Sequence, residues 1–327
     1  MSSSLVYVLR RLIQAIPMAF AIILVNFVLL KLTPGDLVDV MAGESGSATP
    51  EYMDSLRKLY GLDIPVHEQF FNYIYNILHF DLGYSFRQNM AVIDLISERL
   101  PATILLSLTA IAFALIVGVT FGAIAARYRG GLLDEAISVI STMGFATPLF
   151  WVGLMLIVVF SIELRWLPSA GLVTIGAGYA GYWDEMRDVA VHLVLPALTL
   201  SLFFLSIYVR ITRSAMLEVY GLDFVRTARA KGVGGLRLIL RHVLRNALLP
   251  IVTVTGLQVG AIFGGTIVTE TVFGWPGVGR LAHEAVFSRD VNLLLGIFLC
   301  SSMIVIVVNL FVDLLYAVLD PRVEVRR

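Results

Sequence analysis

The sequence predicts an all-α integral membrane protein with about six transmembrane helices. Hydrophobic residues make up 58% of the 327 residues, charged residues only 15%, and the mean hydropathy is +0.86. Soluble domains carry about 25% charged residues, so this chain has too few of them to cover a soluble surface. Six uncharged stretches are each long enough to cross about 30 Å of hydrocarbon as a helix.

The six predicted spans are apolar runs without the alternation that a membrane β-strand requires. They cover residues 12–30, 101–126, 136–162, 189–209, 246–269 and 291–312. The first span follows Arg10 and Arg11, as a cleavable signal would. Its apolar run is longer than the roughly 7–15 residues of such a signal, so we interpret it as an uncleaved anchor.

The distribution of basic residues predicts the orientation. With the N-terminus in the cytoplasm, 15 of the 24 Lys and Arg residues fall in cytoplasmic segments, although the outer segments are longer. Cytoplasmic loops of membrane proteins carry such an excess of positive charge. With six spans, both termini are then expected in the cytoplasm.

The chain divides into three predicted parts. Residues 1–32 are an N-terminal tail with the first span, 33–99 an extracytoplasmic segment, and 100–327 a core domain with the other spans and a cytoplasmic loop at 210–247. The outer segment begins with a Gly/Ser/Thr-rich loop at 43–50. Two short helices are expected after it, one starting behind Thr49-Pro50 and one at 65–80.

The cytoplasmic loop reads RITRSAMLEVYGLDFVRTARAKGVGGLRLILRHVLRN over residues 210–246. It predicts a helix continuing to Glu218, a short helical piece at 224–231 that ends at Gly232, and an amphipathic helix at 236–248. Such a bracket of short helices around glycine turns presents an exposed face that fits a groove on a soluble partner. Topology alone also makes a cytoplasmic loop basic, and on charge alone the two explanations weigh equally.

Catalytic and metal motifs are missing from the sequence. No Gly-x-x-x-x-Gly-Lys-Ser/Thr, His-Glu-x-x-His or Gly-x-Ser-x-Gly occurs, so no catalytic residues and no metal ligands are predicted. The single cysteine, Cys300, excludes an intrachain disulfide.

Two neutral polar residues inside predicted spans, Gln258 and Asn309, are candidates for the lining of a translocation path. Helix-to-helix hydrogen bonding, at about 1 kcal/mol for each bond, is the favoured explanation of both residues. Charged groups near the middle of the membrane, which an ion-coupled carrier would use, are almost absent from these spans.

Several segments carry a resemblance to a known family. They are RTARAKG at 226–232 with LRHVLRNALLP at 240–250, YGLD at 60–63 with FDLGYS at 80–85, and ETVFGWPGVG at 270–279. With these segments the chain resembles the inner-membrane permeases of binding-protein-dependent ABC importers, in their peptide and nickel branch. The cytoplasmic motif departs from the family pattern: Arg226 and Thr227 replace Glu and Ala, and Leu244-Arg245 stands at the Leu-Pro position.

The resemblance implies a type I ABC importer permease fold in a bacterial inner membrane. It implies that Arg226, Thr227, Ala228, Lys231 and Gly232 form a coupling helix that docks on separate ATPase subunits. ATP and Mg would be bound by those subunits, and this chain would hold no cofactor and catalyse no reaction. The other implied partners are a second permease, usually a different chain, an extracytoplasmic substrate-binding protein and the lipid bilayer, with no nucleic acid.

The turn after the fifth span is a further candidate site. Glu270, Trp275, Pro276 and Gly277 are expected to shape an outer gate or a contact for the binding protein. A Pro-Gly pair that simply reverses the chain explains the same residues equally well.

The sequence leaves several transport functions and one enzymatic function to be compared. Import of di- or oligopeptides suits a path lined by small and neutral polar groups, whereas nickel or a nickel chelate is the nearest alternative within the branch. A stand-alone, ion-coupled secondary carrier is the rival from another class. A membrane enzyme would need a catalytic constellation that the sequence lacks.

Overall fold

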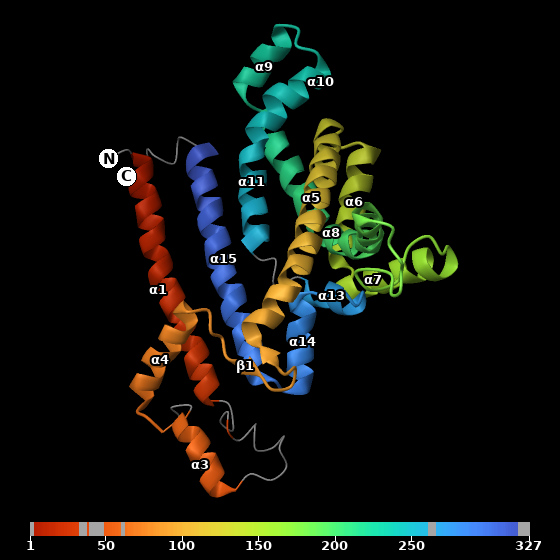
Figure 1. Ribbon diagram of the computed structural model, residues 1–327. Helices are drawn as coiled ribbons and strands as arrows, with labels where there is room; N and C mark the ends of the chain where they lie inside the picture. Colours follow the sequence, from red (N-terminus) through yellow and green to blue (C-terminus); the bar gives the residue numbers. More distant parts are fainter. Residues whose placement is uncertain (1–2, 33–37, 39–48, 60–62, 261–265, 320–327) are drawn as a thin grey trace. The chain divides into compact units, whose positions relative to one another are not determined.

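The computed structural model describes residues 3–32, 38, 49–59, 63–260 and 266–319 (Figure 1). The chain forms two compact units: unit 1 comprises Met1–Leu100 and Leu281–Leu314, and unit 2 comprises Pro101–Arg280 and Leu315–Arg327. Residues 43–48 of the predicted Gly/Ser/Thr-rich loop and the C-terminal arginines at 322, 326 and 327 lie outside the described residues, as does most of the YGLD segment.

Unit 1 begins with α1 (Ser3–Leu32), the predicted first span. The two short helices predicted in the outer segment are present as α3 (Pro50–Leu59) and α4 (Val66–Leu78). Aromatic residues join α4 to α1, because the ring of Phe27 lies 5.1 Å from that of Phe70 and 5.6 Å from that of Tyr73. Helix α4 therefore packs on α1 through a small aromatic cluster.

A two-residue antiparallel hairpin, β1 (Tyr84–Ser85) with β2 (Met90–Ala91), is the one β-structure among the described residues. The Ser85 hydroxyl donates a hydrogen bond to Asp290, whose other oxygen accepts the Leu293 N–H at 3.1 Å. Asp290 thus caps the first turn of α15 (Val291–Leu319), the last span. On α1, Asn26 donates from Nδ2 to the Leu295 carbonyl of α15 at 2.9 Å.

Unit 2 holds the remaining spans and the long loops. Its elements are the greater part of α5 (Val92–Arg127), α6 (Leu132–Ala146), α7 (Leu149–Leu156), η1 (Ile157–Glu163), α8 (Tyr182–Tyr220), α9 (Asp223–Ala230), α10 (Gly235–Arg237), η2 (Leu238–Leu244), α11 (Arg245–Gly260) and α13 (Ile267–Val272). Helix α14 (Val278–Ser288) begins in this unit and continues into unit 1.

The centre of unit 2 is the contact between α5 and α8. Every fourth residue of α5 from Ala102 to Ala126 is buried, and most of these residues are Ala or Gly. Small side chains on one face let two helix backbones approach closely. A Cβ atom added at Gly118 would lie 2.6 Å from the Tyr208 Cβ, and one at Gly122 would lie 2.7 Å from the Thr212 Cβ.

The third predicted span needs a correction. Residues 136–162 were expected to form one helix, but α6 and the α7–η1 helix meet at a bend of 103°. Pro148 has no backbone N–H and disfavours a helical conformation at the residue before it. Thr147 accordingly has φ −82° and ψ 133°, which is extended backbone.

The fifth span also begins and ends elsewhere than predicted. The surface helix expected at 236–248 and the span expected from 246 form one continuous run from Gly235, including the π-helical segment η2. Helix α11 ends at Gly260, residues 261–265 lie outside the described part, and α13 is a separate short helix. Within the described residues, five helices are long and apolar enough to span a membrane, or six if the bent pair is one span.

Candidate functional sites

Helix α9 is the short helix that the basic loop predicted. Leu222 before it is extended, Asp223 lies in its first turn and Arg229 in its last, which suits the helix dipole. The helix ends at a sharp turn where Gly232 has φ +77°, a conformation that glycine adopts without strain. The Gly232 N–H donates to the Arg229 carbonyl at 2.9 Å, and the Val233 N–H to the Ala228 carbonyl at 3.2 Å, so these two carbonyls in the last turn of α9 are satisfied.

One face of α9 is packed and the other is free. Val225 and Ala228 are buried, whereas Arg226, Thr227, Lys231 and Gly232 are exposed. Of the five predicted coupling residues, Ala228 therefore faces the interior and supports the helix, and the other four present a polar surface. The Arg226–Asp223 ion pair, at 3.6 Å, lies between strongly exposed side chains and adds little stability.

The packed face of α9 rests on a buried group that we name the α9 cluster. Its members are Ala126, Ala215, Met216, Val219, Val225, Ala228, Leu238, Ile239, Val243 and Ala247. They come from α5, α8, α9, η2 and α11. Because well-packed interiors deform little, a displacement of α9 is expected to move the ends of these long helices as well.

The second candidate site, Glu270 to Gly277, lies inside unit 2. Trp275 is fully buried, and its Nε1 donates to the Ala102 carbonyl of α5 at 2.9 Å. The Glu270 side chain is also fully buried. Its Oε1 accepts the Thr103 hydroxyl at 2.7 Å, and its Oε2 accepts the Arg280 N–H at 2.8 Å. The carboxylate thereby joins α13, the start of α14 and α5.

Gly277 and Gly279 leave room for the Glu270 carboxylate, because a larger side chain at either position would collide with it. A Cβ atom added at Gly277 would lie 2.3 Å from the Glu270 carboxyl carbon, and one at Gly279 would lie 2.9 Å from Oε2. Burial raises the pKa of Glu270 above its ordinary value, although the hydrogen bonds from Thr103 and the Arg280 backbone act in the opposite direction. The Trp-Pro-Gly turn is therefore wrapped around a buried carboxyl group, and Pro276 is partly exposed beside it.

The two candidate path residues lie in different units, Gln258 on α11 and Asn309 on α15. Both are partly exposed, and within the described residues neither side chain has a hydrogen-bond partner. Among the described residues, therefore, neither Gln258 nor Asn309 joins two helices by a hydrogen bond. A path-lining role stays a prediction.

Sequence reasoning missed three features of unit 2. Thr103 holds Glu270, and a bidentate ion pair joins Arg213 of α8 to Asp134 of α6 at 2.6 Å and 2.8 Å. Neither pair has a signal in the local sequence, because the partners are far apart along the chain. The third feature, the close contact of α5 with α8, did have one: Gly118 and Gly122 form a Gly-x-x-x-Gly motif in an apolar segment.

The fold and these sites define a class of protein. The structure combines several membrane-length helices with a short polar helix held on a packed platform, a construction that suits a membrane transport subunit. The chain belongs to the family of binding-protein-dependent transport system inner membrane components, which matches residues 118–325, while the N-terminal region of such components matches residues 4–109.

Individual relatives agree with the family. The chain is 40% identical to the dipeptide transport system permease protein DppB of Escherichia coli K12, across 97% of this chain and 98% of that protein. It is 39% identical to the di/tripeptide transport system permease protein DppB of Pseudomonas aeruginosa, across 98% and 99%. The solved inward-facing MetNI methionine ABC transporter is 15% identical, with a TM-score of 0.56 over 71% of this chain and 97% of that one, and it shares the fold.

Proposed function

We propose that this chain is the permease subunit of an ATP-driven importer for di- and oligopeptides, and that it forms half of the translocation path. The observation that carries the proposal is the 40% identity to a dipeptide permease over 97% of the chain. The free polar face of α9 supports it, because a packed helix with an exposed surface suits a partner that must push on the spans.

The proposal includes partners that bind on both sides of the membrane. Two ATPase subunits or domains bind ATP and Mg, and one of them docks on α9 of this chain. A second permease completes the path, and a substrate-binding protein delivers peptide from outside. This chain itself catalyses no reaction and holds no cofactor. It lies in a bacterial inner membrane with both termini and α9 in the cytoplasm, as the basic loop favours.

Reconstituted transport tests the proposal. The chain is purified from its native membrane with associated subunits, placed in proteoliposomes, and assayed for uptake of a radiolabelled dipeptide with and without ATP. We expect uptake that requires ATP and is not competed by nickel. Uptake that runs without ATP on an ion gradient would refute the importer and support a secondary carrier, and competition by nickel would redirect the substrate assignment.

A matched pair of variants tests α9 in the same assay. Gly232→Val forces a β-branched residue to φ +77°, whereas Gly234 has φ −62° and nothing within 4 Å of an added Cβ. Since such strain costs on the order of 1–3 kcal/mol, Gly232→Val is expected to reduce ATPase co-purification and uptake about fivefold or more. Gly234→Val is expected to retain both, and equal losses in the two variants would contradict a role of the α9 turn in docking.

A further inference from the structure

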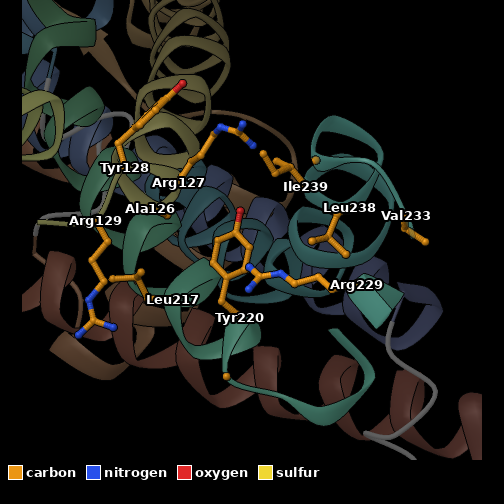
Figure 2. A pocket seen from close by; sticks show the side chains of 12 residues that line it. Ala126, Arg127, Tyr128, Arg129, Leu217, Tyr220, Arg229, Val233, Leu238 and Ile239 are labelled. Atoms are coloured by element: carbon orange, nitrogen blue, oxygen red, sulfur yellow. The ribbon is translucent and has the colours of Figure 1, made fainter. Parts of the chain in front are cut away.

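A cavity of about 620 Å³ lies behind α9 in unit 2. Its walls come from the end of α5, the end of α8, the turn after α9 and the start of η2. The floor is apolar, formed by Ala126, Leu217, Leu238 and Ile239, and the rim carries Arg127, Arg129 and Arg229 with Tyr128 and Tyr220 (Figure 2). A basic rim above an apolar floor suits an amphiphilic anion.

Two of the arginines lie near the side chain of Tyr220. In Figure 2 the Tyr220 hydroxyl lies between the guanidinium groups of Arg127 and Arg229, while Arg129 points away from them. The Arg229 guanidinium lies over the Tyr220 ring at 5.6 Å, and Arg127 lies over the Tyr128 ring at 5.6 Å. These stacking contacts orient the guanidinium planes and leave their N–H groups available.

Within the described residues, no ion pair neutralises Arg127 or Arg229, whereas Arg129 interacts electrostatically with Asp134. Among the described residues no carboxylate oxygen lies within 4.0 Å of Arg127, Arg129 or Arg229, and no hydrogen bond occupies their side chains. Elsewhere on the same end of unit 2, by contrast, Arg213 is paired with Asp134. An excess of basic residues explains the presence of the three arginines, but not why Arg127 and Arg229 line one cavity with no carboxylate beside either of them among the described residues.

From this arrangement we infer that the cavity binds a phosphate group, with Arg127 and Arg229 as its ligands and Tyr220 as an additional hydroxyl donor. Arginine forks match phosphate oxygens, and charge-assisted hydrogen bonds of this kind are strong. The cavity lies where α5 and α8, both long enough to span a membrane, come to an end. Basic pockets between the ends of membrane helices bind phospholipid headgroups, so an anionic phospholipid is the favoured source and free phosphate the other.

This site has a consequence for the α9 cluster. Ala126, Leu238 and Ile239 belong both to the cavity floor and to that cluster. A ligand in the cavity therefore touches the platform on which α9 rests, and its binding is expected to stabilise unit 2.

Thermal unfolding tests the inference on the full detergent-solubilised chain, followed by tryptophan fluorescence. One arm compares added phosphatidylglycerol with equal phosphatidylcholine, and the other compares inorganic phosphate with sodium chloride at equal ionic strength. We expect phosphatidylglycerol to raise the Tm by about 3 °C over phosphatidylcholine in the wild-type chain. Arg127→Gln and Arg229→Gln, each tested separately, are expected to lose most of this shift.

Arg241→Gln is the matched control, because Arg241 is an exposed arginine on η2 that does not line the cavity. It is expected to keep the full shift. A shift with inorganic phosphate that is lost in the same two variants would support the phosphate site and identify free phosphate as the source. Absence of a shift in both arms, or an equal shift in all four proteins, would refute the site. The readout is binding, so the result does not depend on whether the chain imports peptides.

Discussion

Glu270 illustrates how a single side chain organises unit 2. A carboxyl group that is removed from water is unfavourable unless hydrogen-bond donors surround it. Thr103 and the backbone of Arg280 provide such donors, and they come from two elements besides the one that carries Glu270. Trp275 fixes the same turn to α5 through the Ala102 carbonyl. The ETVFGWPGVG segment is therefore a structural joint, whatever it also contacts outside the chain.

Gly277 provides the sharpest prediction at this scale. Gly277→Ala places a methyl group on the Glu270 carboxyl, and overpacking of this kind costs typically about 1–3 kcal/mol. We expect a clear decrease in the Tm of the purified chain, measured by tryptophan fluorescence. Gly178→Ala is the control, because an added Cβ there meets nothing within 4 Å. If both variants unfold at the wild-type temperature, the carboxyl does not occupy the place we describe.

Glu270 also predicts a pH dependence of stability. Burial raises its pKa in the folded chain above the unfolded value, so the folded state binds this proton more tightly. The resulting stabilisation is full below the ordinary glutamate pKa and is lost as the pH rises through the raised value. We expect the Tm of wild type to fall relative to the Tm of Glu270→Gln as the pH rises from about 4.5, because Gln does not titrate. A difference that is constant with pH would contradict this.

At the scale of the elements, α5 is decisive because it touches both candidate sites. Its buried stripe packs against α8, Ala102 and Thr103 hold the turn at 270–277, and Ala126 belongs to the α9 cluster. The stripe contains Ala110, Ala114, Gly118 and Gly122, four residues apart. Lipid tails are as apolar as the helix surface, so the hydrophobic effect contributes little to helix association in a membrane. Close packing of the helix backbones holds the helices together instead.

Substitution in the α5 stripe tests its importance. Gly118→Ala requires α5 and α8 to separate, since the new Cβ would lie 2.6 Å from the Tyr208 Cβ and 3.1 Å from the Leu205 carbonyl oxygen. We expect a lower Tm, by an amount corresponding to about 1–3 kcal/mol.

Gly144→Ala on α6 is the matched control, because it faces the same helix α8 with its nearest contact at an ordinary 3.5 Å. It is expected to be neutral or stabilising, as alanine favours a helix by up to about 1 kcal/mol over glycine. The reverse order of the two Tm values would show that α5 and α8 do not meet at Gly118.

For the whole molecule, the proposed topology places α9 and the loop before α8 on opposite sides of the membrane. The single native cysteine allows a direct test in a Cys300→Ala background. Ile175→Cys and Lys231→Cys, both at exposed positions, are treated in intact cells with a membrane-impermeant maleimide. We expect labelling of Ile175→Cys at once and of Lys231→Cys only after permeabilisation. Labelling of both in intact cells would exclude the proposed orientation.

The sequence by itself determined the class of fold, the two short helices α3 and α4, the short helix α9 and the family. These follow from composition, long apolar runs and glycine turns, which act locally and so are visible in a linear sequence. The coupling role of Arg226, Thr227, Ala228, Lys231 and Gly232 stays a prediction, and the sequence did not indicate that Ala228 faces inward.

Only the tertiary structure decided which distant groups meet. The Arg213–Asp134 pair, the Thr103–Glu270 bond and the cavity lined by Arg127 and Arg229 each join residues brought together by helix packing. Sequence and tertiary structure each determine part of the bend at Pro148. Proline predicts a break in the helix, whereas the packing of α7 on α8 sets the direction of the bend. Hydrophobic pattern fixes which segments are buried, whereas the partners of buried polar groups depend on how those segments cross.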